Sequence, residues 1–183
     1  MANLTFTQLV AQANTTLEDN TSGSITPADV RTMILNMLGT MQPYYAAMNI
    51  GTTPVAFSAT TTYVTLPYES IYTVTTPAWS ASITGTATRL DAATTRVTFT
   101  TDVTLAANRV VDYALFKDGV ITTWVQSQQG TGTGVPISIS FSAITTSATP
   151  NTVYTVRVKT DTATALTHYN TTFVLENVPL IGS

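Results

Sequence analysis

His168 is the single histidine of the chain and the residue with the clearest potential for catalysis. Together with Asp161 and one of the many serines it could complete a hydrolase triad. Serine is abundant here, however, and the chain contains no Gly-x-Ser-x-Gly elbow that would expose a nucleophile. We therefore interpret His168 as a structural or surface residue, and we predict no catalytic residue and no enzymatic activity.

The carboxylates of the β-rich part are the other groups with chemical potential, and they are scattered through separate turns: Asp91, Asp102, Asp112, Asp118 and Asp161. A glycosidase needs two carboxyl groups about 5 to 10 Å apart in a cleft, and nothing in the spacing pairs them. A zinc site needs several His, Cys or carboxylate ligands, whereas the chain has one His and no Cys. The sequence predicts no metal and no cofactor, and it leaves a calcium ion bound by oxygen ligands open.

Trp124 and Tyr169 are the candidate ligand-binding side chains. Trp124 follows the predicted Asp118-Gly119 hairpin, where a tryptophan either caps the core, the more frequent arrangement, or stacks on a ligand. A cleft lined by Trp124, Tyr113 or Tyr169 would favour carbohydrate binding. The glycine-rich run at 130–134 lacks the lysine and the following helix of a phosphate loop, so we interpret it as a connector.

One helix is strongly indicated, and it begins at Thr26-Pro27-Ala28-Asp29. A threonine N-cap, a proline at the first helical position and an acid in the first turn are typical of a helix start. The apolar residues behind this cap form a short seam with spacings of four and three, namely Val30, Ile34, Met37 and Met41. A seam this short is not stable alone, so we predict that it attaches the chain to a partner.

Composition excludes several classes of partner. Charged residues make up 9% of the 183 residues, against about 25% in ordinary domains, and threonine makes up roughly a fifth. The net charge is −3, and the seven Lys and Arg residues are not clustered. The sequence therefore lacks the basic patch that binds nucleic acid or anionic lipid. The N-terminus lacks the basic and apolar regions of a secretory signal, and no apolar stretch is long enough to span a membrane.

From Thr52 onward the sequence has the period of two that is typical of strands. Alternation is clearest at 96–100, 137–141 and 154–159, and turn signals such as Asp118-Gly119 separate the segments. About eight strands without intervening helices predict an antiparallel sandwich. We expect two regions: a helical attachment segment at 1–50 and a β domain at 51–183.

The predicted strand Arg109–Lys117 has two apolar faces: one carries Val111, Tyr113 and Leu115, and the other carries Val110, Ala114 and Phe116. The region around 173–178 is similar. A monomeric sandwich strand needs only one apolar face, so the second is covered either by another subunit or by the N-terminal segment folding back. Exposed apolar patches are usually interfaces, and we therefore predict that Val111, Tyr113 and Leu115 belong to an oligomer interface.

These strands carry a resemblance to a known family. The runs 95–99, 111–119 and 152–158, with a last strand around 173–175, resemble the jelly roll of the tumour-necrosis-factor and complement-head type found in tailed-bacteriophage structural proteins. The segment Gly23–Arg31 is similar to an N-terminal module of phage virion proteins. The resemblance implies a homotrimer, usually with one sheet face of each subunit at the threefold axis.

The resemblance leads to a prediction of function: a non-enzymatic structural protein of a phage particle, assembled in the host cytoplasm. The absence of long fibrous repeats favours a homotrimeric capsid decoration or cement protein, or a head fibre. Its partners would be itself and the major capsid protein or another virion protein. The alternative is a tail-fibre tip that recognises host-surface carbohydrate, and a bacterial surface adhesin is a third interpretation that the missing signal peptide disfavours.

Overall fold

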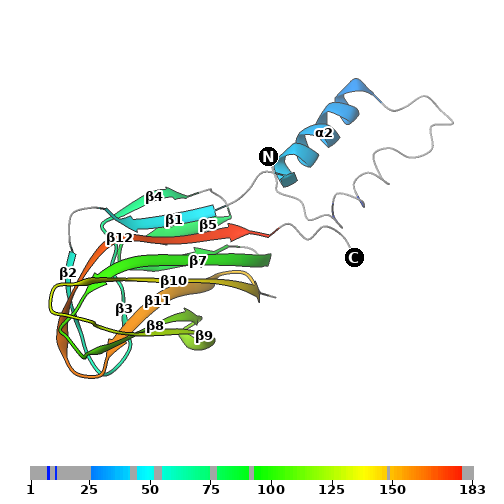
Figure 1. Ribbon diagram of the computed structural model, residues 1–183. Coiled ribbons are helices and arrows are strands. Elements are labelled where there is room, and N and C mark those ends of the chain that lie inside the picture. Colours follow the sequence, from blue (N-terminus) through cyan, green and yellow to red (C-terminus); the bar gives the residue numbers. More distant parts are fainter. Residues whose placement is uncertain are drawn as a thin grey trace. The chain divides into compact units, whose positions relative to one another are not determined.

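The computed structural model describes residues 8, 11, 26–41, 45–51, 55–74, 78–90, 93–147 and 149–178. By its internal contacts the chain divides into two units, of which one comprises Met1–Pro43 with Pro179–Ser183 and the other Tyr44–Val178 (Figure 1). The described part contains no helix that is long and apolar enough to cross a membrane.

Helix α2 (Pro27–Met41) lies in the first unit and begins at the predicted cap. The backbone N–H of Asp29 donates to Thr26 Oγ1 at 3.3 Å, and the N–H of Thr26 donates back to Asp29 Oδ2 at 2.9 Å. The Thr26 hydroxyl also donates to Asp29 Oδ2 at 2.7 Å, and these hydrogen bonds lower the pKa of the Asp29 carboxyl. Reciprocal bonding of this kind satisfies donors that the first turn of a helix leaves unpaired.

The second unit is a sandwich of two antiparallel sheets, as predicted. The first sheet has the order β10-β7-β12-β1-β4, with β2 paired to β12; the second has the order β5-β6-β11-β8-β9, with β3 paired to β11. The strands of the first sheet are β1 (Tyr45–Ile50), β2 (Val55–Ala59), β4 (Ser70–Val74), β7 (Ala93–Thr104), β10 (Pro136–Ser147) and β12 (Thr164–Asn177). Those of the second are β3 (Val64–Thr65), β5 (Trp79–Ser82), β6 (Thr86–Arg89), β8 (Val110–Lys117), β9 (Val120–Gln129) and β11 (Thr152–Thr160).

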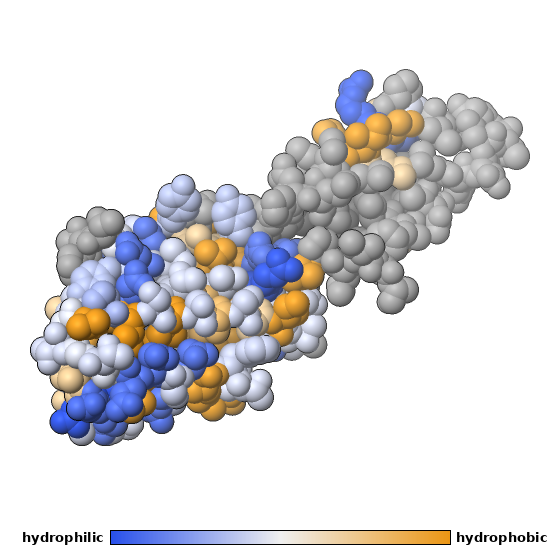
Figure 2. All heavy atoms as spheres, viewed as in Figure 1, coloured by the Kyte–Doolittle hydropathy of each residue, from blue (hydrophilic) through white to orange (hydrophobic). Residues whose placement is uncertain are grey.

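The core lies between the inner faces of the two sheets. Alternate residues of each strand point inward, so β7 contributes Phe99 and β12 contributes Phe173, while β8 contributes Tyr113. The rings of Phe99 and Tyr113 meet across the two sheets at 5.5 Å between centroids. On the face of the β unit that Figure 2 shows, pale areas, the colour of residues such as threonine and serine, lie between separate apolar and hydrophilic patches.

The three strands with the clearest alternation are present, inside β7, β10 and β11. The predicted hairpin is also present, since Asp118 and Gly119 join β8 to β9 with φ values of 50° and 78°. One boundary differs: β1 occupies residues 45–50, which we expected to belong to the helical segment. β1 pairs with β12 on one side and with β4 on the other. Its consecutive buried residues Ala46, Ala47 and Met48 lack the period of two that marks the other strands.

His168 is a core residue of β12, fully buried, so it is structural rather than exposed. Its Nε2 forms a 2.7 Å hydrogen bond with the hydroxyl of Tyr113, and its ring meets those of Tyr113 and Phe57 edge to face. Burial lowers the pKa of His168 from 6.5 to about 4, because the charged imidazolium would lose its hydration. His168 is therefore neutral in the folded protein near pH 7.

This shift predicts a specific acid sensitivity. In the unfolded chain His168 binds a proton near pH 6.5, whereas in the folded chain it does so near 4. The unfolded state therefore binds more protons between these values, and the free energy of unfolding should fall by on the order of 3 kcal/mol as the pH drops through that window. Urea denaturation at steps between pH 7 and 4 measures this slope.

The His168→Gln variant is the control, because glutamine can still bond the Tyr113 hydroxyl but does not titrate. We expect this variant to lose most of the slope between pH 6.5 and 4, whatever its stability at pH 7. An unchanged slope would mean that other groups cause the acid sensitivity.

Candidate interaction surfaces

The apolar seam of α2 is exposed where the structure describes its side chains. Val30 is 43% exposed, and Ile34 and the neighbouring Leu35 are exposed to a similar degree. Met37 and Met41 lie in the helix, but their side chains are outside the described residues. The attachment role of this seam therefore stays a prediction. Val30 and Ile34 are exposed, as that role requires.

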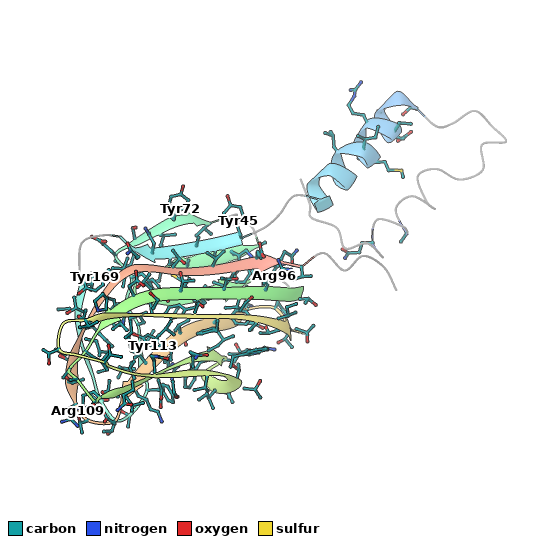
Figure 3. All side chains as sticks on the ribbon, viewed as in Figure 1. Tyr45, Tyr72, Arg96, Arg109, Tyr113 and Tyr169 are labelled. Carbon is teal, nitrogen blue, oxygen red and sulfur yellow. The ribbon has the colours of Figure 1, made fainter. Side chains whose placement is uncertain are left out.

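Val111, Tyr113 and Leu115 do not form an external surface, and the prediction that they contact another subunit needs correction. All three are fully buried in the core of this chain. Tyr113 lies between the two sheets (Figure 3), where it contacts Phe99 and His168 of the first sheet. Residues in this position hold one subunit together and cannot reach a second one while the sandwich is folded.

The opposite face of β8 is covered by side chains of the same unit. The guanidinium of Arg157 lies 4.2 Å from the centre of the Phe116 ring, and Tyr63 meets that ring edge to face at 5.3 Å. The ammonium of Lys159 lies 4.9 Å from the Tyr63 ring and 3.4 Å from an Asp112 oxygen. Long basic side chains cover apolar surface with their methylene stems. The two apolar faces of β8 thus need neither another subunit nor the N-terminal segment.

The best candidate for an interaction surface lies where the two sheets end at β9 and β10. These edge strands contact each other, and in the described chain each pairs with only one neighbour, β9 with β8 and β10 with β7. The sequence from Val120 to Val156 contains no Lys, Arg, Asp, Glu or His. Native edge strands are normally protected by charges, by prolines or by cover from another element, and β9 has neither a charge nor a proline.

This side, which we call the β9–β10 edge, also exposes large apolar side chains. Nine of the ten residues of β9 are exposed. The exposed large apolar residues of β9 and β10 are Val120, Ile121, Trp124, Val125 and Ile144, with exposed fractions between 42% and 69%. Uncharged, exposed and partly apolar strands are typical of surfaces that pair with another polypeptide.

A bulge in β9 sets the position of Trp124. Ala114 opposes Val125 and Phe116 opposes Ile121, so Leu115 faces three residues of β9. The hydroxyl of Thr122 donates to the Leu115 carbonyl at 2.8 Å and accepts from the Trp124 N–H at 3.2 Å, which bridges the interrupted ladder. Trp124 is 42% exposed in mid-strand and does not cap the core, contrary to the more frequent arrangement.

Tyr169 is half-buried on β12, and no contact brings it to Trp124. Its hydroxyl bonds the hydroxyl of Thr104 on β7 at 3.2 Å, whereas Trp124 belongs to the other sheet. Tyr113, the third residue of the expected cleft, is buried. The structure therefore does not assemble the cleft of Trp124, Tyr113 and Tyr169, because Tyr113 faces the core and Trp124 and Tyr169 belong to different sheets.

The described acidic side chains form hydrogen bonds and ion pairs rather than a metal site. Asp102 accepts from Ser138 Oγ at 2.5 Å and from Asn170 Nδ2 at 3.0 Å, and these bonds lower its pKa. Asp161 lies 3.8 Å from Arg109. Within the described ranges no group of three or more His, Cys, Asp or Glu residues could hold a metal ion.

Comparisons with known proteins relate the chain to solved structures only. No family model matches it, and no curated protein matches it. Eiger TNF from S. frugiperda is similar with a TM-score of 0.54 and 13% identity over 75% of this chain and 94% of that one. Murine APRIL, in crystals at pH 8.5 and 8.0, is similar with a TM-score of 0.54 and 7% identity over 75% of this chain and 100% of that one.

These similarities confirm the predicted fold. The β unit is a TNF-like antiparallel jelly roll, and a short helix precedes it along the chain. At 7 to 13% identity the likeness establishes the fold alone, and it transfers no ligand or partner to this chain.

Core and surface positions can be separated by mutation. Leu115→Ala should lower the free energy of unfolding by about 2 to 5 kcal/mol, because it leaves a cavity between the sheets. Val125→Ala at the β9–β10 edge should change it by about 0.5 kcal/mol or less when association is suppressed by dilution. Urea denaturation at two protein concentrations measures both. If the Leu115→Ala protein keeps its free energy of unfolding and only associates more weakly, Leu115 contacts another subunit and not the core.

Proposed function

We propose that this chain is a non-enzymatic structural component of a bacteriophage particle, a homotrimeric capsid decoration, cement or head-fibre protein. It assembles in the host cytoplasm and becomes part of the virion. The N-terminal segment attaches it to the major capsid protein or another virion protein through the seam that includes Val30 and Ile34. The β unit associates with its copies through the β9–β10 edge.

The observation that carries the self-association is the uncharged, exposed β9–β10 edge. A monomer that left this edge free would display apolar side chains beside unpaired backbone donors and acceptors, which favours aggregation. Contact between copies would cover the apolar side chains and the unpaired backbone groups. In a closed ring, where the edge of each copy contacts a different surface of the next, no edge stays free. The jelly rolls that the sequence resembles are usually homotrimers, which agrees with such a ring.

The placement on a particle rests on the resemblance of Gly23–Arg31 and of the strand sequences to phage structural proteins. Two properties of the described residues support a structural role. Several of the few charged groups pair with one another, as Arg96 does with Glu176 at 2.9 Å and Arg109 does with Asp161 at 3.8 Å. The buried histidine is held by Tyr113 and points at no exposed nucleophile.

The alternative function is a tail-fibre or receptor-binding tip, and the exposure of Trp124 favours it. An aromatic ring that is 42% exposed on an uncharged strand can stack on a host-surface sugar. This role and the structural role predict different phenotypes for particles that lack the chain.

Assembly should depend on the β9–β10 edge. We expect the wild-type protein to sediment as a trimer at micromolar concentration, without dependence on metal ions or reducing agent. A Val125→Glu/Ile144→Glu variant places unpaired carboxylates in the interface and should weaken association by about 100-fold or more. The control is Ser80→Glu, which adds a charge to the exposed face of β5 at the opposite end of the second sheet. A wild-type monomer, or a double variant that still forms trimers, would contradict the proposal.

The role on the particle is tested by deleting the gene and measuring heat inactivation beside adsorption to cells. A decoration protein binds only the assembled shell and stabilises it by mass action. Particles without the chain should therefore form and adsorb normally but lose DNA at lower temperature or under osmotic shock. Normal heat resistance with lost adsorption, reproduced by Trp124→Ala, would instead support the receptor-binding alternative.

A further inference from the structure

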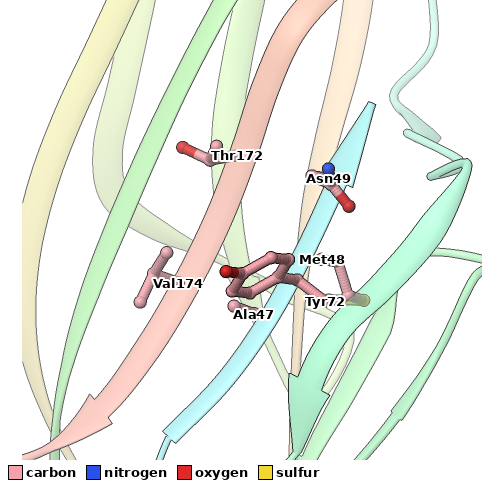
Figure 4. Close-up of a pocket in the computed structure, with 6 residues that line it drawn as sticks. All are labelled: Ala47, Met48, Asn49, Tyr72, Thr172 and Val174. Atoms are coloured by element: carbon pink, nitrogen blue, oxygen red, sulfur yellow. The ribbon is translucent and has the colours of Figure 1, made fainter. Parts of the chain in front are cut away.

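The outer face of the first sheet carries an apolar groove between β12, β1 and β4. The groove has a volume of about 260 Å³, its open surface is almost wholly apolar, and it is lined by Ala47, Met48, Asn49, Tyr72, Thr172 and Val174. Figure 4 shows the ring of Tyr72 extending from β4 across β1, above Ala47, toward Val174 on β12. Ala47 is 9% exposed although it is not part of the core between the sheets, because it lies at the floor of this groove.

Tyr72 is the most exposed of the large hydrophobic residues described, at 78%. It lies at an irregularity of the sheet, because Ile71 opposes Met48 while Thr73 opposes Ala47, so Tyr72 is the extra residue of a β-bulge. Bulges re-aim side chains and are frequent next to functional sites. The bulge places a large ring on the outer face of the sheet, where most of its surface stays available to a partner.

The groove and the strand that carries Tyr72 are free of charge. None of the six lining residues is acidic or basic, and residues 70–88 contain no Lys, Arg, Asp, Glu or His. A charged occupant would find no opposite charge here and would lose its hydration, so the groove selects an apolar, uncharged occupant. The β9–β10 edge of this same chain has that character, because it carries no charge and exposes Trp124, Val125 and Ile144.

The groove and the β9–β10 edge lie at different ends of the first sheet. Strand β10 stands at one end of the strand order, and β1 and β4 stand at the other. One copy can therefore offer its edge to one neighbour and its groove to another, which is the condition for a heterologous ring. Pairing of β10 with the edge of β4 would extend the sheet into an open filament. The groove lies on the face of the sheet instead, so an edge docked there turns each copy relative to the last, as closure of a ring requires.

We propose that the groove beside Tyr72 receives the β9–β10 edge of the next copy of the chain. The inference rests on the proposed self-association and names the surface that completes it. Tryptophan and tyrosine anchors in apolar pockets carry much of the binding energy of protein interfaces, and they tend to meet each other across the contact. Tyr72 is such a side chain in the groove, and Trp124 is one on the edge.

The Tyr72→Glu variant tests this inference by sedimentation of the full-length protein. Because Tyr72 is largely exposed, the variant should keep the urea denaturation curve of the wild type at low protein concentration. A carboxylate at the groove should weaken association by about 100-fold or more, as at the β9–β10 edge, whereas Ser80→Glu on the other sheet should still form trimers. Trimers of Tyr72→Glu at wild-type concentrations would overturn the inference and leave the proposed self-association standing. A monomeric wild type would overturn both.

NMR spectroscopy of mixed variants tests which surfaces meet. The ¹⁵N-labelled Val125→Glu/Ile144→Glu variant keeps the groove, and unlabelled Tyr72→Glu keeps the edge, so one contact can form between them. On titration we expect the amide signals of β1, β4 and β12 around the groove to shift. Unlabelled Val125→Glu/Ile144→Glu is the matched control and should cause no shift, because it has no intact edge. The absence of shifts with Tyr72→Glu, or shifts confined to other strands, would overturn the inference.

Discussion

Burial of two inner sheet faces against each other is the interaction on which the rest of the β unit depends. Strands such as β7, β10 and β11 alternate apolar and polar residues and offer one apolar face, so a single sheet could not bury enough surface to be stable. Large aromatic side chains from both sheets fill the space between them. Phe99 and Phe173 of the first sheet and Tyr113 and Tyr154 of the second are all fully buried. The hydrogen bond between Tyr113 and His168 joins the sheets within this layer and satisfies polar atoms that would otherwise be costly to bury.

A core of this kind leaves the outer faces free to be polar without being charged. Paired threonines cross-link neighbouring strands, as Thr100 does with Thr172 at 2.7 Å. Surfaces of this composition have little electrostatic protection against association, and the β9–β10 edge has none in its own sequence. Contact with other polypeptides through this edge is therefore our proposal for the β unit, and the groove beside Tyr72 lies apart from the edge, between β12, β1 and β4.

The sequence predicted the parts of the fold that local rules determine. The cap at Thr26 and Asp29, the alternating strands and the Asp118-Gly119 turn each depend on a few neighbouring residues, and each is present. Strand β1 was missed because its run of apolar residues has no alternation. The assignment of Tyr113 and its neighbours to an interface failed because Phe99 and His168 of the first sheet cover that face, while Tyr63 and Arg157 cover the opposite face at Phe116. These contacts join residues that are far apart in the sequence.

The candidate surfaces were harder to predict than the fold. Exposure of Trp124 depends on a bulge and on the position of β9 at the edge of a sheet, and no periodicity signals either. Tyr72 was missed for the same reason, since a bulge in β4 decides which way it points. One signal was available in the sequence: the absence of charge from Val120 to Val156 marks the strands that form the edge.

Amide hydrogen exchange of β9 and β10 as a function of protein concentration tests the central claim most directly. If copies of the chain cover the β9–β10 edge, the amides of β9 that do not pair with β8 should be protected at micromolar concentration and exchange rapidly on dilution, while the β7 and β12 amides stay protected throughout. Rapid exchange of the β9 amides at every concentration, in a protein that remains soluble, would contradict the account.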